Sequence, residues 1–198
     1  MMKTTRIISM ILFFLLFINS VKAQINEDNW EYPIKPGQPE WKNLKSKQEM
    51  TNNCQIPTNY LTKMTTDRLI KLCLDYPLLP DIFFYDNLKE GFETKISSFN
   101  GFKELLLRKD LSAVLIKKYI DMQPHLIWST DLNESNNTFK FIFIELLLIQ
   151  PSFIAQLSEM QKKDILSDVL KKYAYKKEIP EAYSIFNLKI SLFIMQCR

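Results

Sequence analysis

The sequence predicts an all-α protein, and three observations support that fold class. Apolar residues recur at helical spacing from residue 41 onward, as in the series Leu69, Leu72, Cys73 and Tyr76. Residues that begin or end helices separate these segments. No Asn-Gly or Asp-Gly turn stands between alternating apolar strands. We expect an irregular helical bundle or a short right-handed α-superhelix of stacked helical hairpins, preceded by an extended proline-rich arm.

The N-terminus has the pattern of a secretory signal peptide over residues 1–23. Lys3 and Arg6 give a positive start, an apolar stretch covers residues 7–18, and small residues precede a predicted cleavage between Ala23 and Gln24. A retained membrane anchor is the alternative, but the apolar stretch is shorter than the roughly 20 residues that a spanning helix needs. We expect a secreted or periplasmic protein with no membrane span after cleavage.

Composition excludes several functions. Removing residues 1–23 leaves 23 basic against 22 acidic residues, so no excess of positive charge favours nucleic-acid binding. The 3 glycines lie far apart, which excludes a glycine-rich phosphate loop, and a single histidine, His125, excludes histidine-clustered metal sites. We therefore assign no catalytic, cofactor-binding or metal-binding residues.

Residues 24–40 form the predicted arm. Pro33, Pro36 and Pro39 occur at a three-residue spacing that favours extended backbone. Three aromatic residues flank these prolines: Trp30, Tyr32 and Trp41. Packing of the arm onto the domain explains them, and an aromatic platform for a carbohydrate or a peptide is the functional alternative.

Residues 41–198 are predicted to form a single helical domain. In its first half, helices are predicted to begin near Ser46 (in a capping box with Glu49), Pro57, Thr65, Asn87 and Asp110. The last of these helices is expected to end before Pro124. Pro77 ends the third of these helices, a short apolar stretch covers residues 78–85, and Asn100-Gly101 interrupts the fourth.

The second half begins with a polar loop over residues 129–137 and a helix over residues 139–149 that is apolar nearly all round, as in a buried helix. A capping box at Ser158 begins the next helix. Pairs of lysines alternate with acidic residues along this helix and predict a solvent-exposed face, formed by Lys162, Lys163, Lys171, Lys172, Lys176 and Lys177. Its expected inner residues are Ile165, Leu166, Val169, Leu170 and Tyr173. Pro180 is expected to start the last helix, which either docks to its very end or belongs to a sequence shortened relative to a longer parent.

Export gives two interpretations of the cysteines. In an oxidising compartment Cys54 and Cys73 are the candidate disulfide, whose closure would stabilise the fold by about 3 kcal/mol. Alternatively, Cys54, Cys73 and Cys197 are all buried small hydrophobic residues.

Glu145 is the most notable carboxylate, because the helix around it offers no polar neighbour. A buried glutamate has a raised pKa and can act as a general acid. The alternative is an ion pair with a lysine or arginine of another helix.

Several segments resemble an uncharacterised family of exported bacterial helical proteins. The resemblance covers residues 30–122 and rests on residues 32–37 (YPIKPG), 54–57 (CQIP), 73–77 (CLDYP), 81–83 (DIF), 100–101 (NG), 104–105 (EL) and 108–110 (RKD). It implies a signal-bearing all-helical protein of unknown function and carries over no catalytic residue.

The expected function is therefore a non-catalytic interaction or scaffold protein of the cell envelope, with an unknown protein or glycan partner. A carbohydrate- or peptide-binding module that uses Trp30, Tyr32 and Trp41, and an envelope hydrolase that uses Glu145, are the alternatives.

Overall fold

The computed structural model describes residues 30–124, 135–183 and 185–196, and over these residues it is all-α. The elements in chain order are α2 (Pro39–Lys42), α3 (Lys47–Asn53), α4 (Thr58–Leu61), α5 (Thr66–Leu74), the 3₁₀ helix η1 (Leu79–Phe84), α6 (Leu88–Ser98), α7 (Asn100–Leu107), α8 (Leu111–Asp121), α10 (Ser135–Leu148), α11 (Pro151–Ile154), α12 (Glu159–Glu178) and α13 (Ile185–Gln196). The predicted signal peptide with its Ala23–Gln24 cleavage site, His125 and Cys197 lie outside the described residues.

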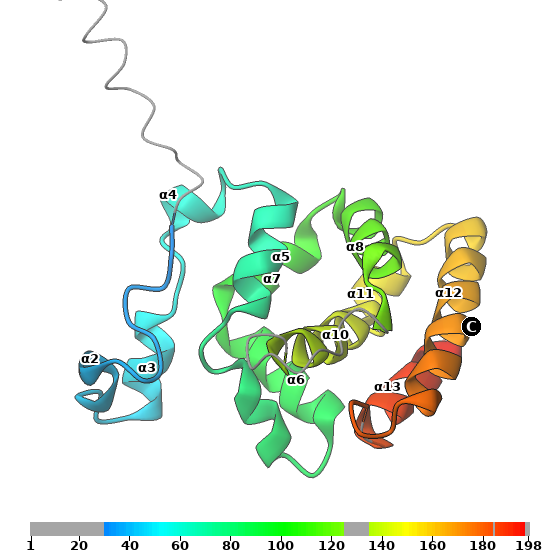
Figure 1. Ribbon diagram of the computed structural model, residues 1–198. Coiled ribbons are helices and arrows are strands. Elements are labelled where there is room, and N and C mark those ends of the chain that lie inside the picture. The colour runs from blue at the N-terminus through cyan, green and yellow to red at the C-terminus, as the bar shows by residue number, and fades with distance from the viewer. Residues whose placement is uncertain (1–29, 125–134, 184, 197–198) are drawn as a thin grey trace, which may run out of the picture.

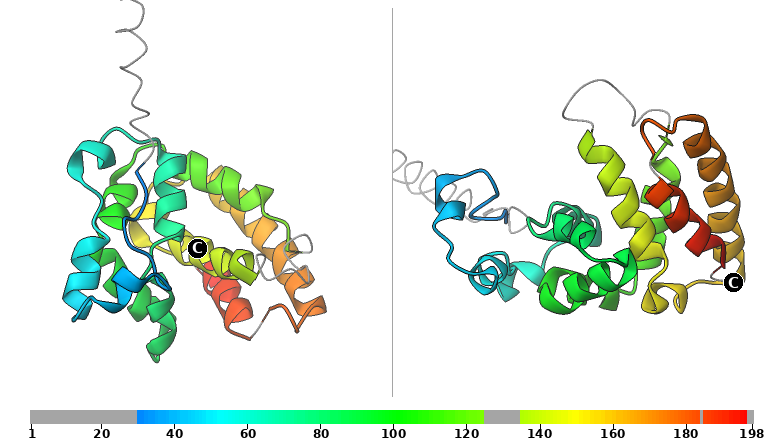
Figure 2. Two further views of the ribbon diagram at one scale, coloured as in Figure 1. Left: turned by 60° about the vertical axis from the view of Figure 1, so that its left-hand side comes forward. Right: turned by 90° about the horizontal axis from the view of Figure 1, so that it is seen from below.

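The helices are arranged roughly in chain order from one end of the molecule to the other (Figure 1). Helices α2 to α4 lie at one end, α12 and α13 form the other, and α10 runs between them. Helix α13 packs on both α12 and α10, and α8 contacts α12 (Figures 1 and 2). This arrangement confirms the predicted all-α bundle.

Several predicted helix starts are present with their capping bonds. The Thr65 hydroxyl accepts from Arg68 N–H, and the Asn87 side chain accepts from Lys89 N–H. The box at Ser158 is complete, since Ser158 and Gln161 satisfy each other's backbone N–H groups. The box at Ser46 is half formed, because the Glu49 carboxylate accepts instead from Lys45 N–H, at 2.6 Å.

The predicted cap Asp110 and the predicted interruption at Asn100 both bond to distant segments instead. The Asp110 carboxylate makes no capping bond in α8 and accepts from the Thr66 hydroxyl of α5, at 2.7 Å. Asn100 begins α7, and its side-chain amide exchanges two hydrogen bonds with the backbone of Ile56. Both side chains thus join segments that are more than 40 residues apart in sequence.

Two further boundaries differ from the prediction. The arm ends at Gln38, because Pro39 occupies the first turn of α2. The last helix begins at Ile185 and not at Pro180, which follows the C-cap of α12 in a turn.

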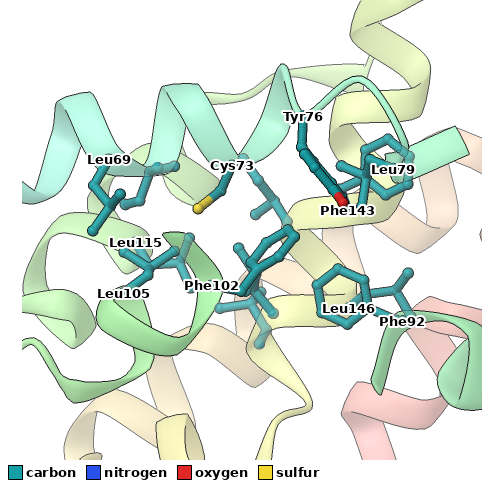
Figure 3. Packing of buried hydrophobic residues seen from close by; sticks show 14 of the residues in the cluster. Leu69, Cys73, Tyr76, Leu79, Phe92, Phe102, Leu105, Leu115, Phe143 and Leu146 are labelled. Carbon is teal, nitrogen blue, oxygen red and sulfur yellow. The ribbon is translucent and has the colours of Figure 1, made fainter. Parts of the chain in front are cut away.

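One continuous core fills the space between the helices (Figure 3). Aromatic rings dominate its first half, where Tyr76 stacks on Phe99 with ring centroids 4.2 Å apart. Phe102 meets both rings edge-on. Gly101 is packed so closely that an added Cβ would lie 2.4 Å from the Phe99 ring.

Candidate functional site

Four polar side chains meet in one buried cluster between α8, α10, α12 and α13. Its members are Tyr119, Glu145, Lys176 and Ser191, one from each helix, and each is 0% exposed. We call this set the Glu145 cluster.

Glu145 is the acceptor at its centre. Lys176 Nζ lies 2.7 Å from Glu145 Oε1, and the Tyr119 hydroxyl donates to the same oxygen at 2.9 Å. The Ser191 hydroxyl lies 3.0 Å and 3.2 Å from the two carboxylate oxygens and 3.1 Å from Lys176 Nζ. The buried charge of each partner is therefore balanced and hydrogen-bonded, as burial of ions requires.

Aromatic rings enclose the ammonium group. Lys176 Nζ lies 4.3 Å from the centroid of the Phe141 ring and 5.8 Å from that of Tyr183. The Tyr183 hydroxyl donates to the Pro124 carbonyl at 2.8 Å, which fixes the ring in place. These faces stabilise the cation by cation–π attraction and separate it from water.

Burial and the carboxylate act on the Lys176 pKa in opposite directions. Burial lowers the pKa of Lys176, and the neighbouring Glu145 carboxylate offsets part of that shift. Burial also raises the pKa of Tyr119 well above its ordinary value, and the negative charge of Glu145 adds to that rise.

This geometry favours a structural role for the cluster. A general acid needs contact with substrate, whereas Glu145 is sealed on all sides and bound to a cation. Ser191 lies beside Lys176 as a nucleophile would lie beside a base, but its hydroxyl donates to Glu145 and Lys176 is paired. The ion pair with another helix, one of the two interpretations of Glu145, is the arrangement observed.

The predicted solvated lysine face of α12 is wrong at two positions. Lys172 and Lys176 are buried, whereas Leu170, expected inside, is 51% exposed. The buried stripe is Ile165, Val169, Lys172 and Lys176, at helical spacing. Lys172 bonds Asp168 Oδ2 at 2.6 Å and donates to the Ile120 carbonyl, so both lysines serve contacts between helices.

The predicted Cys54–Cys73 disulfide is absent, and both residues are free thiols with no exposed surface. Cys73 points among apolar side chains of α5, α7 and α8 (Figure 3). Burial raises the pKa of Cys54 to about 11 and that of Cys73 well above its ordinary value, so neither forms a reactive thiolate readily. The packing of these two cysteines as small hydrophobic residues, the alternative from the sequence, is the arrangement observed.

The aromatic residues of the arm also pack onto the core. Tyr32 is buried and its hydroxyl donates to the Leu72 carbonyl at 2.8 Å. Trp30 meets the Tyr32 ring edge-on at 4.9 Å, and Trp41 packs separately, partly buried, against the core. The three therefore anchor the arm and do not form a shared exposed platform.

An aromatic patch does lie on the surface elsewhere. Phe83 and Phe84 of η1 are 37% and 88% exposed, and Phe139 of α10 is 47% exposed. The Phe83 ring meets Phe139 edge-on at 5.6 Å and rests on the buried Phe143 at 6.2 Å. We call Phe83, Phe84 and Phe139 the aromatic patch. The sequence marks residues 78–85 as apolar, but only the fold brings them beside Phe139.

A second surface feature is a pocket of about 180 Å³ at the end of the molecule formed by α11, α12 and α13. Most of its lining is apolar: Leu148, Ile165 and Ile194 are buried, and we call them its base, whereas Leu166 and Met195 are partly exposed. Glu159, Lys162 and Lys163 also line it, and Glu159 and Lys162 form an ion pair at 2.8 Å. Lys163 is exposed and adds a positive charge beside the apolar lining.

Comparison with known proteins gives no relative from which a function could be transferred, since no family model, curated protein or solved structure matches the chain. Among the helices of the described ranges, none is both long and apolar enough to cross a membrane. Within the same ranges no three potential metal ligands gather at one point. The two surface features are therefore judged on their own geometry.

Proposed function

We propose that the protein is a non-catalytic interaction protein of the cell envelope that binds a protein partner through the aromatic patch. The observation that carries the proposal is the exposure of Phe83 and Phe139, whose rings are in contact, together with Phe84, which follows Phe83 in the chain and is 88% exposed. Aromatic side chains of this kind dominate the binding energy of protein interfaces, and burying them against a partner removes apolar surface from water.

The packing of the patch favours binding. Phe83 is held between Phe139 and Phe143, so its orientation is set before binding and little side-chain entropy remains to be lost. The sequence pattern of residues 1–23 supports export, and with it a partner in the envelope.

The alternatives receive less support. An envelope hydrolase would need substrate access to Glu145, which the cluster seals, and a carbohydrate or peptide platform would need Trp30, Tyr32 and Trp41 to be exposed together. No observation on the described residues favours either function over the interaction protein.

The test is capture of a partner from the envelope fraction of the source cells with matched bait proteins. We expect wild type and Phe193→Ser to retain one stoichiometric partner, whereas Phe84→Ser and Phe139→Ser lose it. Phe193 is the control because it is 49% exposed, close to the 47% of Phe139, and lies on α13.

Two outcomes would overturn the proposal. Retention of the partner by Phe84→Ser and Phe139→Ser would exclude the patch as its binding surface. Turnover of a cell-wall or glycan substrate that Glu145→Gln abolishes, with the fold intact by circular dichroism, would replace the interaction protein with a hydrolase.

A further inference from the structure

The pocket between α11, α12 and α13 has the size and chemistry of a site for a small amphipathic anion. We propose that it binds an alkyl carboxylate, with the alkyl chain in the apolar lining and the carboxylate beside Lys163 and Lys162. This site is separate from the aromatic patch and does not depend on the proposed protein partner.

The volume limits the apolar part of the ligand. At about 180 Å³ the pocket is slightly larger than an apolar cavity of about 150 Å³ that stays dry and binds benzene. By that comparison an alkyl chain of about six to eight carbons fills it. Longer chains would leave carbons in water and gain nothing further from burial.

The lining comes from separate segments that are fixed in place. Ile165 and Ile194 belong to α12 and α13, which pack directly on each other, and Leu148 lies at the end of the buried helix α10. Met195 gives the lining an adaptable side chain that can adjust to the ligand. The base is therefore preformed, as small-molecule sites usually are.

The charges at the pocket decide the sign of the head group. Glu159 is already neutralised by Lys162, whose Nζ lies 2.8 Å from its carboxylate, so Lys163 leaves a net positive charge. These residues also belong to the first turn and a half of α12, where the helix dipole adds partial positive charge. An anionic head group is therefore attracted and an ammonium head group is repelled.

The probes are octanoate, octan-1-ol and octylammonium, titrated into the purified full chain by isothermal calorimetry at low salt. We expect octanoate to bind at one site, octan-1-ol to bind several-fold more weakly, and octylammonium to bind most weakly. An exposed charge contributes little, so the gap between octanoate and octan-1-ol should be about three- to tenfold and should shrink in salt.

Matched variants connect the binding to this pocket. Leu166→Trp fills the lining and should abolish octanoate binding, whereas Leu170→Trp, one turn further along α12 and already exposed, should not change it. Lys163→Glu should weaken octanoate and strengthen octylammonium, whereas Lys171→Glu, also exposed on α12, should change neither by more than about twofold. Met195→Trp fills the lining from α13 and replaces Leu166→Trp if that variant does not fold.

Three results would overturn the proposal: no octanoate binding at millimolar concentration, equal loss of binding in Leu166→Trp and Leu170→Trp, or equal affinity for octanoate and octylammonium. None of these results bears on the aromatic patch, and loss of the patch partner in Phe84→Ser leaves the octanoate titration unchanged.

Discussion

Replacing Glu145 by glutamine tests whether the Glu145 cluster stabilises the fold as an ion pair. Glutamine has nearly the same shape and keeps a carbonyl oxygen for the Tyr119 and Ser191 hydroxyls, but it removes the negative charge. Lys176 would then be a buried cation whose nearest counter-ion has gone, with Nζ formerly 2.7 Å from Glu145 Oε1.

The expected cost follows from the burial of both partners. Removing one member of a fully buried ion pair costs about 3–5 kcal/mol, because the other charge stays desolvated and uncompensated. The Phe141 and Tyr183 faces near Lys176 Nζ place the cost at the lower end, about 3 kcal/mol, through cation–π attraction. The control is Asp121→Asn, which breaks an exposed pair with Lys117 and should leave the stability nearly unchanged.

Urea unfolding monitored by far-ultraviolet circular dichroism measures both variants. With a slope of about 2 kcal/mol per molar urea, Glu145→Gln should lower the midpoint by about 1.5 M without changing the slope. The double variant Glu145→Gln/Lys176→Met should be more stable than the sum of the single changes predicts, because it leaves no unpaired charge. A midpoint shift below about 0.5 M, or additive single changes, would refute the ion-pair argument.

The pH dependence gives the same argument a second test. Burial lowers the pKa of Lys176 while Glu145 raises it, so glutamine at position 145 should lower that pKa further. The folded state then releases the Lys176 proton at a lower pH than the unfolded state does, and stability increases with pH over that interval. The deficit of Glu145→Gln relative to wild type should therefore shrink from pH 7 toward pH 10. A deficit that stays constant would mean that Lys176 keeps its proton by another route.

Three further predictions concern the core and the N-terminus. In a Cys197→Ser background, Cys54 and Cys73 should react with a thiol reagent only after unfolding, and reaction in the native state would contradict their burial. Gly101→Ala should destabilise the protein by about 1–3 kcal/mol in urea unfolding, because the added methyl group would meet the Phe99 ring, which is stacked on Tyr76 and cannot easily move. Alanine favours helices over glycine, so a gain in stability would contradict this packing. The protein recovered from a secreting bacterial host should have a mass that begins at Gln24, and an intact Met1 would contradict the signal peptide.

Features determined by nearby residues could be predicted from the sequence. The starts of α5, α6 and α12 follow from Thr65, Asn87 and Ser158, whose side chains bond backbone groups two or three residues away. Asp110 has the same pattern, yet its carboxylate bonds Thr66, 44 residues earlier, and no local rule identifies that partner. The same limit applies to the aromatic patch, since Phe83 and Phe139 meet only in the fold.

The inner face of α12 was predicted only in part: Ile165 and Val169 are buried as expected, but polarity was a misleading guide at the other inner positions. Hydrophobicity alone places Leu170 inside and Lys176 outside, and the structure has the reverse. The observed inner face also has helical spacing in the sequence, because it consists of Ile165, Val169, Lys172 and Lys176. Spacing alone therefore permits this face as well as the one that contains Leu170. Glu145 decides between the two faces, because a buried carboxylate requires a cation and Lys176 is within reach.

The same cluster explains the orientation of α13, which is apolar nearly all round and so has little hydrophobic preference for one face. Its polar residues Asn187 and Ser191, four positions apart, face inward, whereas Leu192 and Phe193 remain partly in water. Because hydrophobicity leaves the rotation of α13 nearly undetermined, the bonds of Ser191 to Glu145 and Lys176 account for the one observed. Ile194 lies one turn after Ser191, and this rotation therefore also places it at the base of the proposed carboxylate pocket. A buried polar cluster without catalytic access can in this way determine where a binding site forms.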